Sequence, residues 1–415
     1  MRNLVVVAFA LLLAYYGPQQ DHTHRFDAAW MLGALALLAA VGGQLAQRLG
    51  LPAVVGWLVA GLVLGASGLQ VVRPDALSIH QLLLLFTGLW VGFHVGLNVV
   101  WPRSLDWRGP VLMAVATLLV FLAVTAAVAL LVEPPWGVAL LIGALASMWG
   151  PFTGVPATQR RGALLLAVLG AGASLLLLSG VLVLLESEAV VEAGASLWAA
   201  RVWLALLAGG GLGVVLRLLG LFVAPASTLF AGLMVAFLFA SLALEEWGLP
   251  ALPCGLAVGL ALRRHPLQNR RVRLLLHRAA PAAFMLFFAL LGTSLKLDIL
   301  WPVADGLLEV ALVMAAAPLF LRGLAPIAYY PLPAPDPGPG RRIGWQLLPR
   351  GALLFELFYG PHGLGQYAGS GGLLGQAVLV DILLSALLFS ALASLLGERV
   401  VWPRSAPEPE SVPAA

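Results

Sequence analysis

The sequence predicts an all-α polytopic membrane protein, and its composition and its apolar runs carry that prediction. Of its 415 residues, 61% are hydrophobic and 10% are charged, which leaves too little polar surface for a soluble domain of this length. Apolar runs of roughly 20 residues, the length that crosses a bilayer as a helix, recur along the whole chain. The net charge of +4 is spread over many short loops, so it indicates topology and not a nucleic-acid partner.

Apolar runs bounded by Arg, Pro, Gly or Trp predict fourteen transmembrane helices. They are expected over residues 4–16, 28–46, 52–65, 77–95, 110–132, 136–149, 162–185, 197–216, 226–244, 250–262, 279–293, 306–321, 346–359 and 373–396. We interpret the first as an uncleaved helix and not a signal peptide, because no small-residue cleavage pattern follows it. Spans 52–65, 136–149 and 250–262 are too short to cross straight, which indicates that flanking residues join them or that they are interrupted inside the protein.

One transmembrane domain, residues 28–402, makes up most of the chain. Residues 1–27 are expected to form the short first helix and a loop, and residues 403–415 a disordered cytoplasmic tail. The proline-rich segment 331–342 is typical of a stiff, extended linker.

The basic residues segregate between alternate loops of this arrangement. Arg25, Arg73, Arg201 and Lys296 fall on one side, and the remaining 19 of the 23 Lys and Arg residues fall on the other. Cytoplasmic loops of membrane proteins carry an excess of Lys and Arg. Both termini are therefore predicted to be cytoplasmic, in a multi-pass protein of the plasma membrane, the inner membrane of a bacterium.

Seven short motifs occur in order along the chain. They are "RLGLPAVVGWLVAGLVLGASGL" (48–69), "GFHVGLN" (92–98), "GALASMWGPFTG" (143–154), "LPALPCGLAVGLALRR" (249–264), "PAAFMLFFALLGTSLKLDIL" (281–300), "LFLRGLAPIAYY" (319–330) and "GWQLLPRGALLFE" (344–356). On its own, the first predicts close helix packing through its small residues, Gly56, Ala60, Gly61 and Gly65. Together, from about residue 28 to 396, the seven resemble the monovalent cation/proton antiporter superfamily, of the sodium/hydrogen exchanger type.

This resemblance implies thirteen family helices behind one additional N-terminal helix, two inverted repeats, and a core in which two interrupted helices cross at mid-membrane. Residues 136–154 and 346–361 are the candidates for the interrupted helices, since both are short and run into a Gly-Pro pair. It further implies secondary transport by alternating access, with a monovalent cation and a proton as substrates, in a lipid bilayer and in a homodimer. No cofactor is expected.

The resemblance also places an aspartate at the middle of the helix over 162–185, where it would bind a proton or the cation. The middle of this helix instead reads LGAGAS, with Gly172 and Ala173 at its centre, and nothing there titrates. Two glutamates of the family motifs are replaced as well, by Asn98 and Ala352.

The basic residues of those motifs, Arg322 and Arg350, are present. Losing three acids while keeping two arginines makes this core more positive than the family pattern. An ion site of the usual composition is therefore not expected.

Two acids inside predicted helices offer a replacement. Glu356 lies four residues beyond Ala352, on the same helix face, and Asp381 lies in the last helix. A carboxylate inside the membrane costs several kcal/mol, so it is a functional candidate by default. The alternative is that each pairs with an arginine or a polar neighbour and holds helices together.

Three other polar residues lie in or near the predicted helices. Ser147 and Thr153 offer oxygens to an ion or bond back to their own helix. His94, near the end of its helix, is expected to be a satisfied histidine.

The leading prediction is a secondary transporter with an atypical ion site. Two alternatives stay open: a non-transporting structural or sensory homologue, or an exchanger of an anion or neutral solute, which the two arginines would suit. No nucleophile, base and orienting partner fall together, so neither an enzyme nor a metal site is expected. The letters "AGGGLG" (208–213) lie in an apolar span without a preceding strand, which predicts helix packing and not phosphate binding.

Overall fold

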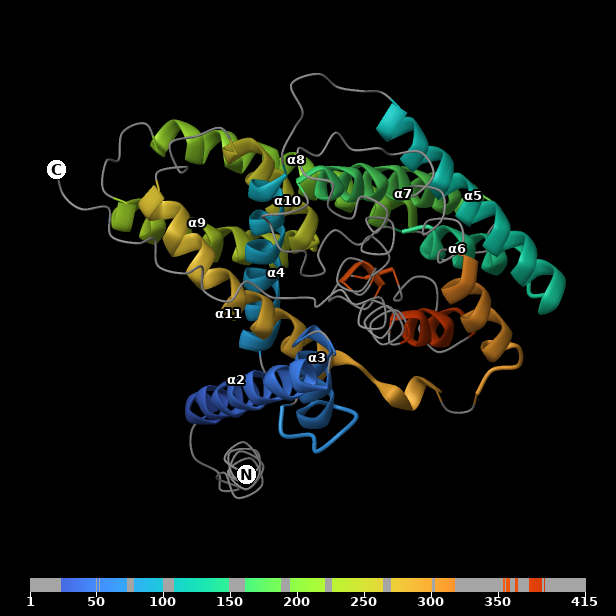
Figure 1. Cartoon of the computed structure of the whole chain (residues 1–415), viewed down its shortest axis with the longest axis horizontal. Helices are drawn as coiled ribbons and strands as arrows, with labels where there is room; N and C mark the ends of the chain where they lie inside the picture. The colour runs from blue at the N-terminus through green and yellow to red at the C-terminus, as the bar shows by residue number, and fades with distance from the viewer. Residues whose placement is uncertain are drawn as a thin grey trace.

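The computed structural model is a bundle of α-helices, and the residues it describes contain no strand (Figure 1). The described residues are 24–49, 51, 53–72, 78–99, 108–148, 161–187, 195–220, 226–263, 270–300, 303–317, 354, 356–358, 363–364, 373–382 and 384.

The described part of the chain contains the following helices in order. Their bounds are α2 His24–Arg48, α3 Ala53–Leu64, α4 Ser78–Asn98, α5 Arg108–Leu131, α6 Trp136–Ala146, α7 Arg161–Ser187, α8 Ala195–Gly220, α9 Ala226–Trp247, α10 Ala251–Leu262, α11 Arg270–Ser294, the 3₁₀ helix η3 Leu297–Leu300, and two further helices, Leu307–Ala317 and Leu373–Ile382. Six helices in the described part of the chain are long and apolar enough to cross a membrane, and α3, α6 and α10 are shorter apolar helices.

The predicted spans agree with the observed helices from α2 to α10. In α11, however, the helix begins at Arg270 and not at 279, so the sequence placed its start too late. Arginine and leucine favour helix, and they continue α11 into the basic segment, which a hydropathy pattern assigns to a loop. The span over 4–16 lies outside the described residues, and those over 346–359 and 373–396 lie within them only in part.

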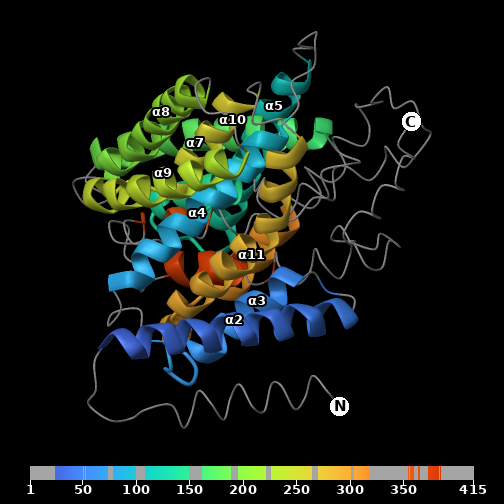
Figure 2. The same cartoon turned by 90° about the vertical axis from the view of Figure 1, so that its left-hand side faces the viewer.

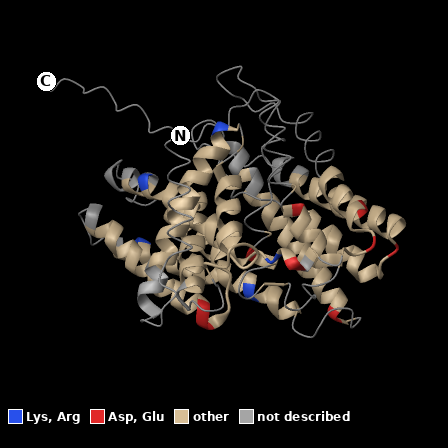
Figure 3. Ribbon diagram, turned by 90° about the horizontal axis from the view of Figure 1, so that it is seen from below, with Lys and Arg blue, Asp and Glu red and all other residues tan. Residues whose placement is uncertain are grey.

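Large apolar side chains cover the outside of the bundle. Leu130 of α5, Leu207 of α8 and Phe239 of α9 are 80%, 73% and 67% exposed. Charged residues of the described chain are scattered along otherwise uncharged helices (Figure 3). An apolar outer surface of this extent suits contact with lipid and not with water.

The bundle has α2 and α3 together at one edge, away from α8 and α9, while α4 and α11 run between them (Figures 1 and 2). Small residues allow the backbones of these helices to come close together. A Cβ atom at Gly56 of α3 would collide with the backbone of Gly42 in α2, and one at Gly61 would lie 2.9 Å from Gly292 Cα in α11. The structure therefore confirms the packing role predicted for the small residues of the first motif.

Glycines also clamp α10 between α4 and α8. Gly92 of α4 meets the backbone of Leu252, Gly255 of α10 meets the backbone of Leu89, and Gly209 of α8 meets the backbone of Cys254, each too closely to admit a Cβ atom. The helices α4, α8 and α10 thus form one closely packed body. In the run at 208–213, Gly209 and Gly213 pack against α10, as predicted.

Candidate functional site

The short helix α6 ends next to the middle of α7. At about 1.5 Å per residue, its 11 residues reach roughly half of a bilayer's hydrocarbon thickness of about 30 Å. Ala146, Ser147 and Met148, at its end, are fully buried. The Ser147 hydroxyl donates to the carbonyl of Ala144 at 2.7 Å, so it bonds back to its own helix, one of the two arrangements expected for it.

Ser174 of α7 joins the two helices. Its hydroxyl oxygen lies 2.8 Å from the carbonyl oxygen of Ser147 and 2.8 Å from that of Gly170, and the side chain is fully buried. Ser147 lies beyond the end of α6, where carbonyls have no partner within the helix. Ser174 therefore bonds to a backbone oxygen at the end of the short helix α6.

Because of this contact, we expect alanine substitutions at Ser174 and at Ser241 to have different effects on stability. Ser241 of α9 is equally buried, but its hydroxyl donates only within its own helix, to Phe237 at 2.7 Å. Ser174→Ala should lower the free energy of unfolding by about 1 kcal/mol, because it removes a buried hydrogen bond between helices. Ser241→Ala should leave it within about 0.5 kcal/mol of wild type. Thermal unfolding of the two variants in detergent measures the difference, and equal midpoints would contradict the role given to Ser174.

The middle of α7 has room beside it. Gly172 and Ala173 are half-buried, and a Cβ atom at Gly172 would have no heavy atom within 4 Å. Close packing therefore does not explain this glycine, in contrast to the glycines around α10. Neither residue contributes a titratable group.

Glu356 bonds to the beginning of α10. Its carboxylate accepts from the backbone N–H of Ala251 at 2.7 Å and from that of Leu252 at 3.0 and 3.2 Å. The side chain is 5% exposed, and it makes no ion pair within the described residues. Of the two roles expected for Glu356, the structure shows a bond to a polar neighbour, and that neighbour is a helix N-terminus.

The N-terminus of α10 offers few backbone N–H donors. Pro250 and Pro253 have no N–H, so the free backbone donors of the first turn are those of Ala251 and Leu252. No side chain of α10 itself caps this end. Helix N-termini attract negative charge, and here a carboxylate from a segment 105 residues away supplies it.

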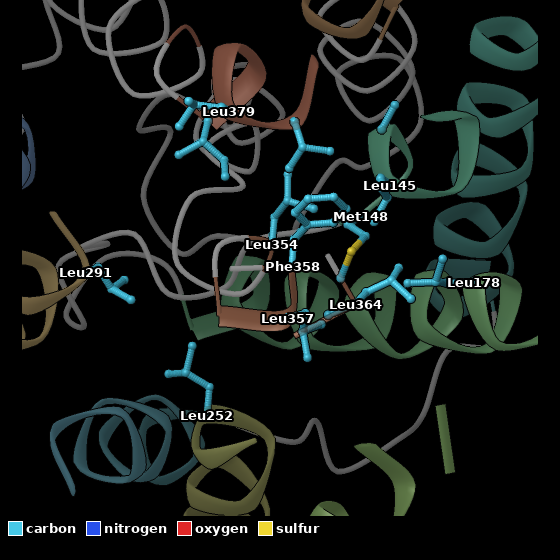
Figure 4. Packing of buried hydrophobic residues seen from close by; sticks show 14 of the residues in the cluster. Leu145, Met148, Leu178, Leu252, Leu291, Leu354, Leu357, Phe358, Leu364 and Leu379 are labelled. Carbon is cyan, nitrogen blue, oxygen red and sulfur yellow. The ribbon is translucent and has the colours of Figure 1, made fainter. Parts of the chain in front are cut away.

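Large apolar side chains surround the contact between Glu356 and the start of α10. Leu145 and Met148 at the end of α6, Leu178 of α7, and Leu354, Leu357, Phe358 and Leu364 pack together, while Leu252 of α10 lies on the other side of the segment that carries Glu356 (Figure 4). The segment around Glu356 therefore lies between the α6–α7 pair and the α4–α8–α10 body.

Asp381 lies apart from Glu356 in the sequence, in the helix Leu373–Ile382, and is 1% exposed. Glu356 and Asp381 are the two buried carboxylates among the described residues. In the same helix, the side-chain carbonyl of Gln376 accepts from the backbone N–H of Ala304 at 2.8 Å.

Other candidates are bonded locally or lie outside the described chain. Asn98 donates from its side chain to the carbonyl of His94 at 2.7 Å, one turn back along α4. The ring of His94 packs edge-on against Phe284. Thr153, Arg322 and Arg350 lie outside the described residues.

The comparisons with known proteins agree with this architecture. The family model described as "Sodium/hydrogen exchanger, transmembrane" matches residues 33–401. The chain belongs to the sodium/hydrogen exchanger family. This is a family of transporters, so the chain is a multi-pass membrane protein and its chemistry is not that of an enzyme family.

The fold is also similar to that of a solved structure. The sodium proton antiporter MjNhaP1 from Methanocaldococcus jannaschii, at pH 8, superposes with a TM-score of 0.56 at 17% sequence identity, over 90% of this chain and 98% of that one. This likeness shows the fold. No curated protein sequence matches the chain.

Sequence reasoning missed two features of the site. Ser174 went unremarked because a serine in an apolar helix resembles a packing residue, although it is the polar side chain nearest the centre of its span. The acceptor role of Glu356 was signalled by "LPALPCG" (249–255), in which two prolines leave a helix start with two backbone donors and no capping side chain.

Proposed function

We propose that this member of the sodium/hydrogen exchanger family exchanges a monovalent cation for protons by alternating access, with Glu356 in place of the acid that α7 lacks. The observation that carries the proposal is the buried carboxylate of Glu356 at the junction between the α6–α7 pair and the α4–α8–α10 body. A carboxylate held away from water is retained at a cost, and binding a proton is the chemistry it offers.

The setting proposed for this activity follows the topology. The protein lies in the plasma membrane, the inner one of a bacterium, with both termini cytoplasmic because most basic residues fall on that side. It functions there as a homodimer. Alternating access requires the α6–α7 side of the junction to move against the α4–α8–α10 body, and Glu356 is placed where that movement occurs.

The test of the proposal is transport in proteoliposomes under an imposed pH gradient. We expect Na⁺, K⁺ or Li⁺, added outside, to dissipate the gradient faster than in protein-free vesicles. If none of the three moves the internal pH, cation/proton exchange by this chain is wrong.

One observation favours a second candidate, a non-transporting structural or sensory homologue. The Ser174 hydroxyl lies within hydrogen-bond distance of the carbonyl oxygen of Ser147, so this oxygen at the end of α6 has less capacity to bind an ion while the bond is in place. Under this alternative the vesicles remain silent with all three cations. An anion or neutral-solute exchanger would likewise leave them silent, but it would take up a labelled solute.

A further inference from the structure

We propose that Glu356 is a proton-released latch, which in its ionised form ties residues 356–358 to the N-terminus of α10 and on protonation weakens that tie. The inference rests on the proposed function for its role in transport, but the latch itself is a property of the contact. It makes Glu356 a positioning residue as well as the proton-binding group.

The geometry of the contact requires an acceptor. Both backbone donors of Ala251 and Leu252 are directed at the two oxygens of Glu356. A carboxylate accepts through both oxygens, whereas a protonated carboxyl turns one of them into a donor and loses its charge. Protonation therefore removes the charge-assisted part of these bonds and the attraction to the helix N-terminus.

The described residues hold the two sides of the contact in different ways. On the α10 side, glycine packing fixes the helix against α4 and α8, where a Cβ atom at Gly255 would lie 2.8 Å from the Leu89 carbonyl carbon. On the other side, within the described residues, leucine contacts surround Glu356 and no ion pair binds it. Weakening these hydrogen bonds by protonation thus weakens the polar tie that the described residues show between Glu356 and α10.

Within the part of the chain that the structure describes, the helices α8, α9, α10 and α4 bring the following charged and titratable groups toward this region. Within α10, the buried thiol of Cys254 interacts electrostatically with Glu356. The segment before α10 carries Glu245, half-buried, and Glu246, exposed. The helices that hold α10 carry His80 and His94 in α4 and Arg201 and Arg217 in α8, and within the described residues none of these four side chains hydrogen-bonds to Glu356.

Hydrogen exchange of the purified full-length protein, read by mass spectrometry on the peptide that holds Ala251 and Leu252, tests the latch without any transport measurement. In wild type we expect both amides to be protected at high pH. As the pH falls, their exchange should rise at least about tenfold, after correction for the intrinsic pH dependence of exchange. In Glu356→Gln, which keeps one acceptor oxygen but no charge, the same amides should exchange faster than in wild type at high pH, with no pH-dependent step.

The matched control is Glu309→Gln, which changes an exposed glutamate in the helix Leu307–Ala317 and should preserve the wild-type profile. Protection that is independent of pH in wild type would overturn the latch and leave Glu356 as a permanent cap, even if Glu356→Gln fails to fold. Equal protection in wild type and Glu356→Gln would also overturn it.

The outcomes separate this inference from the proposed function. A pH-dependent latch in a protein that dissipates no pH gradient would refute the transport proposal alone. Cation/proton exchange by a protein whose amides stay protected at every pH would refute the latch alone.

Discussion

Replacing Gly209 with alanine is expected to destabilise the protein by about 3 kcal/mol, while the same change at its neighbour Gly210 is expected to stabilise it slightly. A Cβ atom on Gly209 would lie 2.8 and 2.9 Å from the backbone carbonyl carbon and Cα of Cys254 in α10. Backbone atoms yield far less readily than the end of a side chain, so the two helices must separate.

At Gly210, a Cβ atom would have no heavy atom within 4 Å. Alanine is a better helix former than glycine by about 0.5–1 kcal/mol, and this gain should appear in full at an unobstructed position. Thermal unfolding in detergent compares the two variants, and a third variant, Gly255→Ala, should resemble Gly209→Ala. Similar midpoints for the variants at 209 and 210 would show that α8 and α10 do not pack as described.

Glu356→Gln is expected to reduce cation-driven proton movement to the level of protein-free vesicles. Glutamine keeps the size of the side chain and one acceptor oxygen, but it binds no proton in the physiological range and carries no charge. If Glu356 binds the exchanged proton, the variant lacks the group that binds it. Reconstituted vesicles under an imposed pH gradient measure the loss, with Glu309→Gln as the control that should transport like wild type.

A different result would identify another group. If Glu356→Gln transports at the wild-type rate, Glu356 has no part in proton exchange and its bond to α10 is purely structural. Asp381, the second buried carboxylate of the described chain, would then be the next acid to replace.

The helical architecture was predictable because lipid leaves few options for a chain of this composition. Every buried backbone group must be satisfied within a segment, so a long apolar run between polar boundaries has to be a helix, as in α5 and α7. The glycine motifs predicted packing for the same physical reason, since Gly56 and Gly61 have value in a membrane helix mainly where another backbone comes close.

The pairing of helices and of polar groups was not predictable from the sequence. The arrangement of the whole bundle decides which backbone lies against Gly92 or Gly209. Local periodicity in the sequence does not indicate that partner. The same holds for Glu356, because an acid's spacing along its own helix says nothing of a helix start 105 residues earlier in the chain. The late start assigned to α11 has a local cause, since hydropathy detects the membrane boundary and not the helix boundary.

Cation/proton exchange at Glu356 requires a cation to displace a proton from this carboxyl group, and proton release on cation addition tests this directly. Purified protein in weakly buffered detergent solution is titrated with Na⁺, K⁺ and Li⁺ while the pH is recorded. We expect at least one of these cations to acidify the solution with wild type and with Glu309→Gln, and none to do so with Glu356→Gln. Equal acidification by wild type and Glu356→Gln would contradict this expectation.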